Sequence, residues 1–310
     1  MKICILGATS EIAKDLIILL SNEKDKDLHL FARRPEEVIK WLGNIGLSKI
    51  KHVDSFDSFG TQSFDVILNF VGVGNPVKAA AMGASIFDVT INYDELALKY
   101  LHKNPKCRYI FLSSGAAYCS SFKFPVDETT KSTVDINNLH PQDWYGVSKL
   151  HAECRHRSLS SLPIVDIRVF NYFSHSQDME SRFLIADIVR STRDRTILKT
   201  SSEIMVRDYI TPKDFHSIIS AILNSPLKND VIDCYSKLPI EKSILLETFK
   251  DEFGLQYEYE ENAAGVNATG RKPHYYSLNK RASQFGYQPS LTSLEGVIYE
   301  AKHILAISQV

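Results

Sequence analysis

The sequence has few cysteines and almost no net charge. Its cysteines are Cys4, Cys107, Cys119, Cys154 and Cys234. They are odd in number, scattered and without a C-x-x-C pair, which argues against a disulfide framework and a cysteine-bound zinc ion. Unpaired thiols are typical of a reducing compartment, so we expect a cytoplasmic protein. The formal net charge of -1 does not indicate a nucleic acid or a membrane surface as a partner.

Long apolar segments are also missing. The run 16–20 is far too short to span a bilayer. The N-terminus has no signal-peptide pattern, because residues 2–6 already have the pattern of a strand. The histidines do not have a spacing typical of metal ligands, so we expect no metal site. The histidines expected on helix surfaces instead are His102, His140, His151 and His156.

What the sequence does contain is the composition of an ordinary folded protein. Its 310 residues are 44% hydrophobic and 24% charged, which allows one large domain or two modest ones. The short apolar segments expected to be strands are 2–6, 28–31, 51–53, 66–70, 109–112 and 164–168. Segments with helical periodicity lie between them, at 11–20, 35–42 and 92–101. This alternation predicts an α/β fold with a Rossmann-type doubly wound parallel sheet.

The alternation fades after about residue 170. The later segments with helical patterns are 183–189, 241–253, 278–285 and 294–305. Residues 205–210 and 231–235 look like strands, and 262–270 has the small and polar residues of a loop. We therefore predict a sheet domain over residues 1–170, with later returns near 204–235. Residues 171–310 are expected to form mainly a smaller C-terminal lobe.

The first predicted strand ends in a turn that suits a phosphate group. Gly7 is followed by ATSEIA and then a helix, and amides at a helix N-terminus bind the pyrophosphate of a dinucleotide. Only one of the three glycines of the strong motif is present, with Ser10 and Ala13 near the other two places. An ordinary capped turn would have the same pattern. The candidate cofactor contacts are Gly7, Thr9, Ser10, Glu11 and Ile12.

The end of the second predicted strand distinguishes between the two nicotinamide cofactors. An acid at this position usually binds the free ribose hydroxyl of NAD. Here the strand is followed at once by Arg33 and Arg34, and guanidinium groups pair with phosphate. The arginines therefore favour NADP over NAD, although a solvated pair at a strand end is the simpler explanation. Asp54 and Ser55, after the third strand, are weaker candidates for contact with adenine.

One predicted helix carries a tyrosine and a lysine that suit proton transfer. Tyr145 and Lys149 are four residues apart in PQDWYGVSK, so they share one helix face. An ammonium beside a phenol favours the phenolate, so we expect a lowered pKa for Tyr145. Such a tyrosine exchanges a proton with an alcohol or sugar oxygen. The same four-residue spacing recurs at 209/213 and 276/280, so the spacing alone is weak evidence. The neighbouring segments distinguish this pair from the other two.

Taken in order, these segments resemble the extended short-chain dehydrogenase/reductase family, which contains nucleotide-sugar epimerases, dehydratases and reductases. The resemblance covers nearly the whole chain. Its motifs are the turn 7–13, VILNFVG at 66–72, IFLSSGAAY at 110–118, the Tyr-x-x-x-Lys helix at 141–149, RVFNY at 168–172, RDYI at 207–210 with Asp214, GRKP at 270–273 and FGYQP at 285–289. The segment 66–72 departs from the family's usual His-x-Ala-Ala ending.

The resemblance implies roles for individual residues. The catalytic residues would be Ser114, Tyr145 and Lys149, with Ser114 rather than Ser113 because it stands four residues before a tyrosine. Phe70 and Val71 would lie beside the nicotinamide ribose. The residues expected to bind the substrate are Ser114, Asn171, Arg207 and Arg271, with Tyr275 as a further pocket residue. Residues 1–170 become the NADP-binding domain and 171–310 the substrate-binding lobe.

The same resemblance frames the function. Because the arginines favour NADPH, the cell's usual reductant, we expect a reductase of a nucleotide-diphosphate 4-keto-6-deoxy sugar that serves surface polysaccharide synthesis. A nucleotide-sugar 4-epimerase and a non-catalytic NADP-binding sensor stay open. A dehydratase fits less well, because Gly115 and Ala116 stand where family dehydratases tend to carry acids. By analogy with relatives, helices at 92–101 and 145–159 would form a homodimer.

Overall fold

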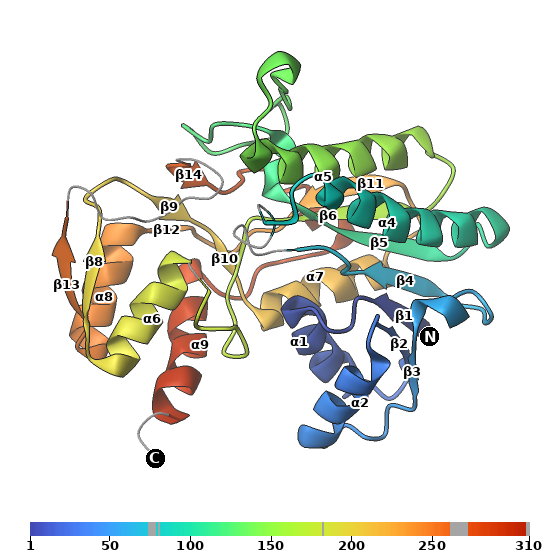
Figure 1. The fold of residues 1–310 in the computed structure, drawn as a ribbon, viewed down its shortest axis with the longest axis horizontal. Helices are drawn as coiled ribbons and strands as arrows, with labels where there is room; N and C mark the ends of the chain where they lie inside the picture. Colours follow the sequence, from blue (N-terminus) through green and yellow to red (C-terminus); the bar gives the residue numbers. More distant parts are fainter. Residues whose placement is uncertain (74–78, 80, 182, 261–271, 308–310) are drawn as a thin grey trace.

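A seven-stranded sheet forms the centre of the computed structural model, which describes residues 1–73, 79, 81–181, 183–260 and 272–307 (Figure 1). In sheet order its strands are β11 (Asp230–Asp233), β6 (Ile164–Val169), β5 (Arg108–Ser114), β4 (Val66–Asn69), β1 (Lys2–Leu6), β2 (Asp27–Phe31) and β3 (His52–Asp54). All neighbouring pairs are parallel. The predicted α/β fold with a doubly wound parallel sheet is confirmed. The order reverses between β1 and β4, where such sheets bind ligands beyond the carboxyl ends of their strands.

Helices cover both faces of this sheet (Figure 1). On one face lie α1 (Glu11–Leu20), α2 (Pro35–Asn44) and α7 (Pro212–Asn224), and on the other lie α4 (Ser85–Lys103) and α5 (Pro141–Ser158). Strand β1 contributes to both layers, since Ile3 and Ile5 pack with the first group and Cys4 and Leu6 with the second. Burial on both faces explains why this strand is apolar throughout.

A second, smaller group of elements lies beside the sheet (left in Figure 1). Its helices are α6 (Leu184–Asp194), α8 (Lys242–Phe253) and α9 (Ser293–Ile307), which share one apolar core. Its strands are β7 (Asn171–Tyr172), β8 (Ile197–Thr200), β9 (Val206–Arg207), β10 (Tyr209–Ile210), β12 (Ile240–Glu241), β13 (Gln256–Tyr259) and β14 (His274–Tyr275). They pair as β10-β7, β12-β9-β14 and β13-β8. Elsewhere along the chain, the described residues form short 3-10 helices η1 (Phe56–Ser58), η2 (Gly115–Tyr118), η3 (Ile136–Asn138) and η4 (Arg281–Phe285).

The later part of the chain departs from the sequence prediction in several places. The single strand predicted at 205–210 is wrong, because β9 and β10 belong to different sheets. Asp208 interrupts it: its buried carboxylate accepts hydrogen bonds from the backbone N of Ser236 at 3.1 Å and from Ser293 Oγ at 2.9 Å. Helix α7 and strands β8 and β13 were not predicted, and 278–285 holds only η4.

Two further points concern the chain as a whole. The predicted strand at 231–235 corresponds to β11, which joins the edge of the main sheet beside β6. The predicted loop at 262–270 lies outside the described residues. Among the helices that the structure describes, none combines the length and the apolar character needed to cross a bilayer.

Candidate active site

The turn after β1 approaches the end of β4 very closely. Gly7 has a φ of +82°, and a Cβ added there would lie 2.9 Å from the backbone C of Phe70 and 2.9 Å from the backbone N of Val71. No other residue fits without moving one of the two strands, which explains why this glycine is the one that the motif retains. Gly7, Phe70 and Val71 therefore meet at the point where the strand order reverses.

The remaining residues of the turn surround the N-terminus of α1. Ser10 is the N-cap residue, as expected, but its side chain makes no capping hydrogen bond. Thr9 and Glu11 are exposed, Ile12 is half-buried, and Glu11 Oε1 accepts a long hydrogen bond from the backbone N of Asp178 at 3.4 Å. A close-packed glycine turn leading into a ten-residue helix fits the pyrophosphate of a dinucleotide.

The residues proposed for the adenosine end follow β2 and β3 at the same edge of the sheet. Arg33 and Arg34 are exposed, and Arg34 Nη1 lies 2.8 Å from Glu37 Oε1. Both partners of this pair are largely exposed, so it contributes little and a phosphate could replace it. Asp54 ends β3, and its carbonyl accepts from the backbone N of Ala32 at 3.1 Å. The hydroxyl of Ser55 donates to Asp57 Oδ2 at 3.3 Å.

The two serines at the end of β5 point to different surroundings. Ser113 Oγ donates to the buried carboxylate of Glu153 at 2.5 Å. Ser114 is the N-cap of η2, where its Oγ accepts from the backbone N of Ala116 at 3.2 Å and lies 3.3 Å from the hydroxyl of Tyr275. The Ser114 hydroxyl is also close enough to Tyr145 to act on the pKa of its phenol. Side chains alternate along a strand, so only the second serine faces the tyrosine.

Helix α5 brings Tyr145 to this serine because it packs closely on η2. A Cβ at Gly146 would lie 2.6 Å from the carbonyl oxygen of Ala116. Glycine is therefore required after the tyrosine for α5 to approach the end of β5. The half-buried Tyr145 then reaches Ser114.

One turn later, Lys149 is buried against the strand ends. Its Nζ donates to the carbonyl of Leu112 at 2.8 Å and lies 4.4 Å from the ring centre of Phe111. A Cβ on Gly72, just beyond β4, would lie 3.5 Å from the same Nζ. Burial lowers the pKa of Lys149 to about 8.

The lowered pKa expected for Tyr145 is wrong for this structure. Burial raises the pKa of Tyr145, and the hydrogen bond from Ser114 opposes that rise. Lys149 does not contribute, because its ammonium turns toward the carbonyl of Leu112 and not toward the phenol. Sharing a helix face does not by itself bring two side chains into contact.

Two of the predicted substrate residues brace a neighbouring segment. Asn171 Nδ2 donates to the carbonyls of Asp208 at 3.3 Å and Tyr275 at 3.1 Å. Arg207 Nη1 donates to the carbonyl of Lys272 at 2.8 Å, and burial lowers the pKa of this arginine. Both residues thereby hold the segment 272–275. Arg271, the third predicted substrate residue, lies outside the described residues.

The structure also places Lys272 beside Tyr275, a residue position that the sequence analysis missed. Its Nζ lies 4.9 Å from the ring centre of Tyr275 and 5.5 Å from that of Phe122. Burial, followed by the positive charge of Arg207, lowers the pKa of Lys272 to about 8. No spacing in the sequence predicts this, because the pairing of β14 with β9 sets the position.

A chain of buried polar groups runs behind the cleft. Asn69 accepts from the backbone N of Val71 at 3.0 Å and donates to the hydroxyl of Tyr109 at 2.9 Å, which in turn donates to Asp94 at 2.9 Å. His156 lies between Asp94 and Asp166, with ring nitrogens 2.8 and 2.6 Å from their oxygens. The expectation that His156 lies on a helix surface is wrong, since its exposed fraction is 0%.

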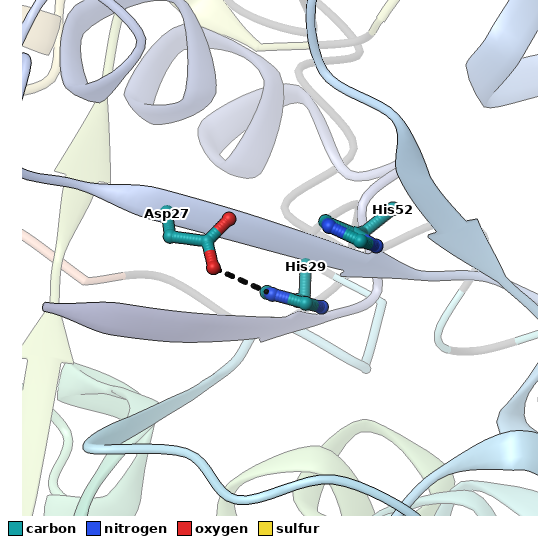
Figure 2. Close-up of side chains that lie close together, drawn as sticks. All are labelled: Asp27, His29 and His52. Carbon is teal, nitrogen blue, oxygen red and sulfur yellow. Dashed lines mark hydrogen bonds and ion pairs between the residues drawn. The ribbon is translucent and has the colours of Figure 1, made fainter.

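Among the described residues, one group of possible metal ligands lies away from the cleft. Asp27, His29 and His52 stand near the starts of β2 and β3, and their ligand atoms lie within 4.8 Å of one another. Figure 2 shows the two imidazoles one above the other, with Asp27 bonded to the edge of His29 at 3.1 Å. The rings are 4.1 Å apart and 11° from parallel, so their in-plane lone pairs do not converge on one ion. We assign no metal to this group.

Comparisons with known proteins agree with this architecture. Solved structures with the same fold include a UDP-glucuronic acid 4-epimerase from Bacillus cereus in complex with UDP-glucuronic acid and NAD (17% identity, TM-score 0.77, covering 99% of this chain and 100% of that one). A UDP-N-acetylglucosamine 4-epimerase from Methanobrevibacter ruminantium M1, in complex with UDP-N-acetylmuramic acid, has 16% identity and a TM-score of 0.79, covering 100% and 99%. A dTDP-glucose 4,6-dehydratase from Bacillus anthracis, in complex with NAD, has 16% identity and a TM-score of 0.73, covering 97% and 96%.

At such low identity these structures establish the fold alone. A search of curated proteins found no match. The family model described as "NAD dependent epimerase/dehydratase family" matches residues 3–234, about three quarters of the chain. The matched segment contains the glycine turn, Ser114, Tyr145 and Lys149. The chain belongs to the NAD-dependent epimerase/dehydratase family.

Proposed function

We propose that the protein is an NADPH-dependent reductase of a nucleotide-linked 4-keto-6-deoxy sugar. The observation that carries this proposal is the meeting of Ser114 and Tyr145 at the carboxyl edge of the sheet. The buried ammonium of Lys149 lies next to Gly72, in the same crevice as the Gly7 turn. A proton donor, an orienting hydroxyl and a cation beside a dinucleotide crevice are what reduction of a carbonyl requires.

Each of these residues has a distinct part in the proposed reaction. Bound NADPH would supply the hydride to the sugar carbon. Tyr145 gives its hydroxyl proton to the oxygen of that carbon as negative charge develops there, and Ser114 donates a hydrogen bond to the same oxygen. Lys149, held by the carbonyl of Leu112 next to Gly72, would bind the nicotinamide ribose.

The choice of NADPH rests on Arg33 and Arg34. Both are exposed at the end of β2, where the ribose phosphate of this cofactor would lie, and two guanidinium groups favour a phosphate over a neutral hydroxyl. The complexes from Bacillus cereus and Bacillus anthracis contain NAD, which supports a nicotinamide cofactor without favouring NADPH.

The second candidate is a nucleotide-sugar 4-epimerase, because two of the similar structures are 4-epimerases. Such an enzyme would use the same three residues in both directions on one substrate. In either case we propose that residues 1–170 bind the cofactor and that residues 171–310 mainly bind the nucleotide sugar. We also propose a cytoplasmic homodimer formed through α4 and α5.

The test is turnover by the purified protein with a panel of nucleotide 4-keto-6-deoxy sugars, following NADPH and NADH oxidation and analysing all products. Net NADPH consumption with one sugar supports the reductase. Isomer formation without net consumption indicates the epimerase. Cofactor binding without turnover of any sugar, unchanged in Tyr145→Phe, would contradict both and favour a sensor.

A further inference from the structure

A second tyrosine, supplied by the other part of the molecule, lies beside Ser114. Tyr275 ends β14, and its hydroxyl lies 3.3 Å from Ser114 Oγ. Ser114 also lies close enough to the phenol of Tyr145 to lower its pKa. Two phenols that lie 130 positions apart in the sequence thus converge on one hydroxyl. The chemistry of a single acid/base tyrosine does not explain the second one.

Tyr275 is held firmly in this position. Its ring packs edge-on against Phe122, at 4.7 Å and 75°, and against Phe170, at 5.3 Å and 61°. Its carbonyl accepts from Asn171 Nδ2 at 3.1 Å, and β14 pairs with β9 so that Tyr275 lies opposite Arg207. Aromatic packing on two sides and a fixed backbone leave the hydroxyl little freedom, so it is preorganised for whatever lies beside Ser114.

The surroundings also separate the chemistry of the two phenols. Burial raises the pKa of Tyr275; the hydrogen bond with Ser114 opposes this, and negative charge on Tyr145 raises it further. The phenol of Tyr275 therefore stays protonated when Tyr145 gives up its proton. Burial raises the pKa of Tyr145 as well, so the two phenols differ in that ionisation of Tyr145 hinders ionisation of Tyr275.

We propose that the Tyr275 hydroxyl contacts the reacting sugar oxygen as a second hydrogen-bond donor beside Ser114. The Tyr275 hydroxyl is 3.3 Å from Ser114 Oγ, so a sugar oxygen that binds Ser114 between the two phenols would lie within its reach. Tyr275 stabilises the negative charge that develops on the oxygen, and no bond to it forms or breaks. The C-terminal lobe would thus complete the catalytic set, and this inference rests on the proposed function.

The test is Tyr275→Phe, which removes the hydroxyl and keeps the ring between Phe122 and Phe170. Loss of one preorganised donor is expected to lower kcat by roughly 100- to 1,000-fold. NADPH affinity and the melting temperature should stay within error of wild type. The matched control is Tyr276→Phe, because the adjacent side chain points to the other side of the strand and its ring contacts His274. This variant should keep the wild-type kcat.

The outcomes distinguish a failure of the proposed function from a failure of the inference about Tyr275. If wild type turns over no nucleotide sugar, the proposed function fails and this inference fails with it. If wild type is active and Tyr275→Phe retains its kcat within about two-fold, the inference alone is overturned. A lower kcat accompanied by a matching loss of thermal stability or of NADPH affinity would show a packing role and also overturn it.

Discussion

The buried histidine behind the cleft leads to a specific prediction about stability and pH. Both ring nitrogens of His156 face carboxylate oxygens, at 2.6 Å from Asp166 and 2.8 Å from Asp94. A neutral imidazole has only one N–H, so one nitrogen would then place a lone pair against a carboxylate. The geometry therefore requires the protonated form. Burial lowers the pKa of His156, but Asp166 and Asp94 outweigh this effect and raise it to about 9.

The magnitude follows from this pKa. A rise from the ordinary value of 6.5 to about 9 corresponds to roughly 3 kcal/mol of native-state stabilisation. Because the folded-state pKa is the higher one, this contribution is fully present below about pH 6.5. It is lost as the pH rises through about 9, where the folded protein also releases the proton.

The perturbation is His156→Gln, measured by urea denaturation at several pH values. We expect the variant to be less stable than wild type, most strongly near pH 6, and the difference to shrink by roughly 3 kcal/mol as the pH rises above about 9. Comparing the two proteins at each pH removes the contributions of other groups, such as Lys149. His151→Gln is the control, since His151 lies exposed on the same helix. A stability difference independent of pH would refute the reasoning.

Three other predictions concern the cofactor-binding residues and the catalytic serine. Gly7→Ala places a Cβ 2.9 Å from two backbone atoms and should weaken NADPH binding by more than about ten-fold in calorimetry, whereas Gly43→Ala, with nothing within 4 Å, should bind normally. Replacing Arg33 and Arg34 together by serine should raise the Kd for NADPH by about ten-fold or more and leave NADH unaffected; equal losses for both cofactors would contradict the phosphate role. Ser114→Ala should reduce kcat by roughly 100- to 1,000-fold with unchanged NADPH affinity, and full activity would remove this serine from the catalytic set.

Local patterns were sufficient for the sheet domain. The strands β1, β2, β4, β5 and β6 were predicted to within two residues at each end. Each is a short apolar run, and burial on both faces imposes that composition wherever a parallel strand lies. The end of β1 at Gly7 was also a local prediction, because a turn from a strand into a helix favours a glycine in the turn and a capping residue such as Ser10.

Elsewhere the local signal was misleading or absent. Residues 205–210 have a strand pattern. The side chain of Asp208 nevertheless accepts hydrogen bonds from Ser236 and Ser293, and the segment is divided into two short strands in different sheets. His156 was expected on a helix surface but lies between Asp94 and Asp166. These partners come from distant parts of the chain, and a pattern within a few residues contains no information about them.

The candidate site divides in the same way. The sequence by itself determined that Tyr145 and Lys149 share a face of α5 and that Ser114 closely follows a strand, because helix and strand periodicity are properties of the local backbone. Only the tertiary structure decided that Lys149 turns to Leu112, that Gly146 allows α5 to approach η2, and that Tyr275 enters the cleft. Those outcomes depend on close packing between elements that lie far apart in the chain, and such packing is fixed only when the whole core forms.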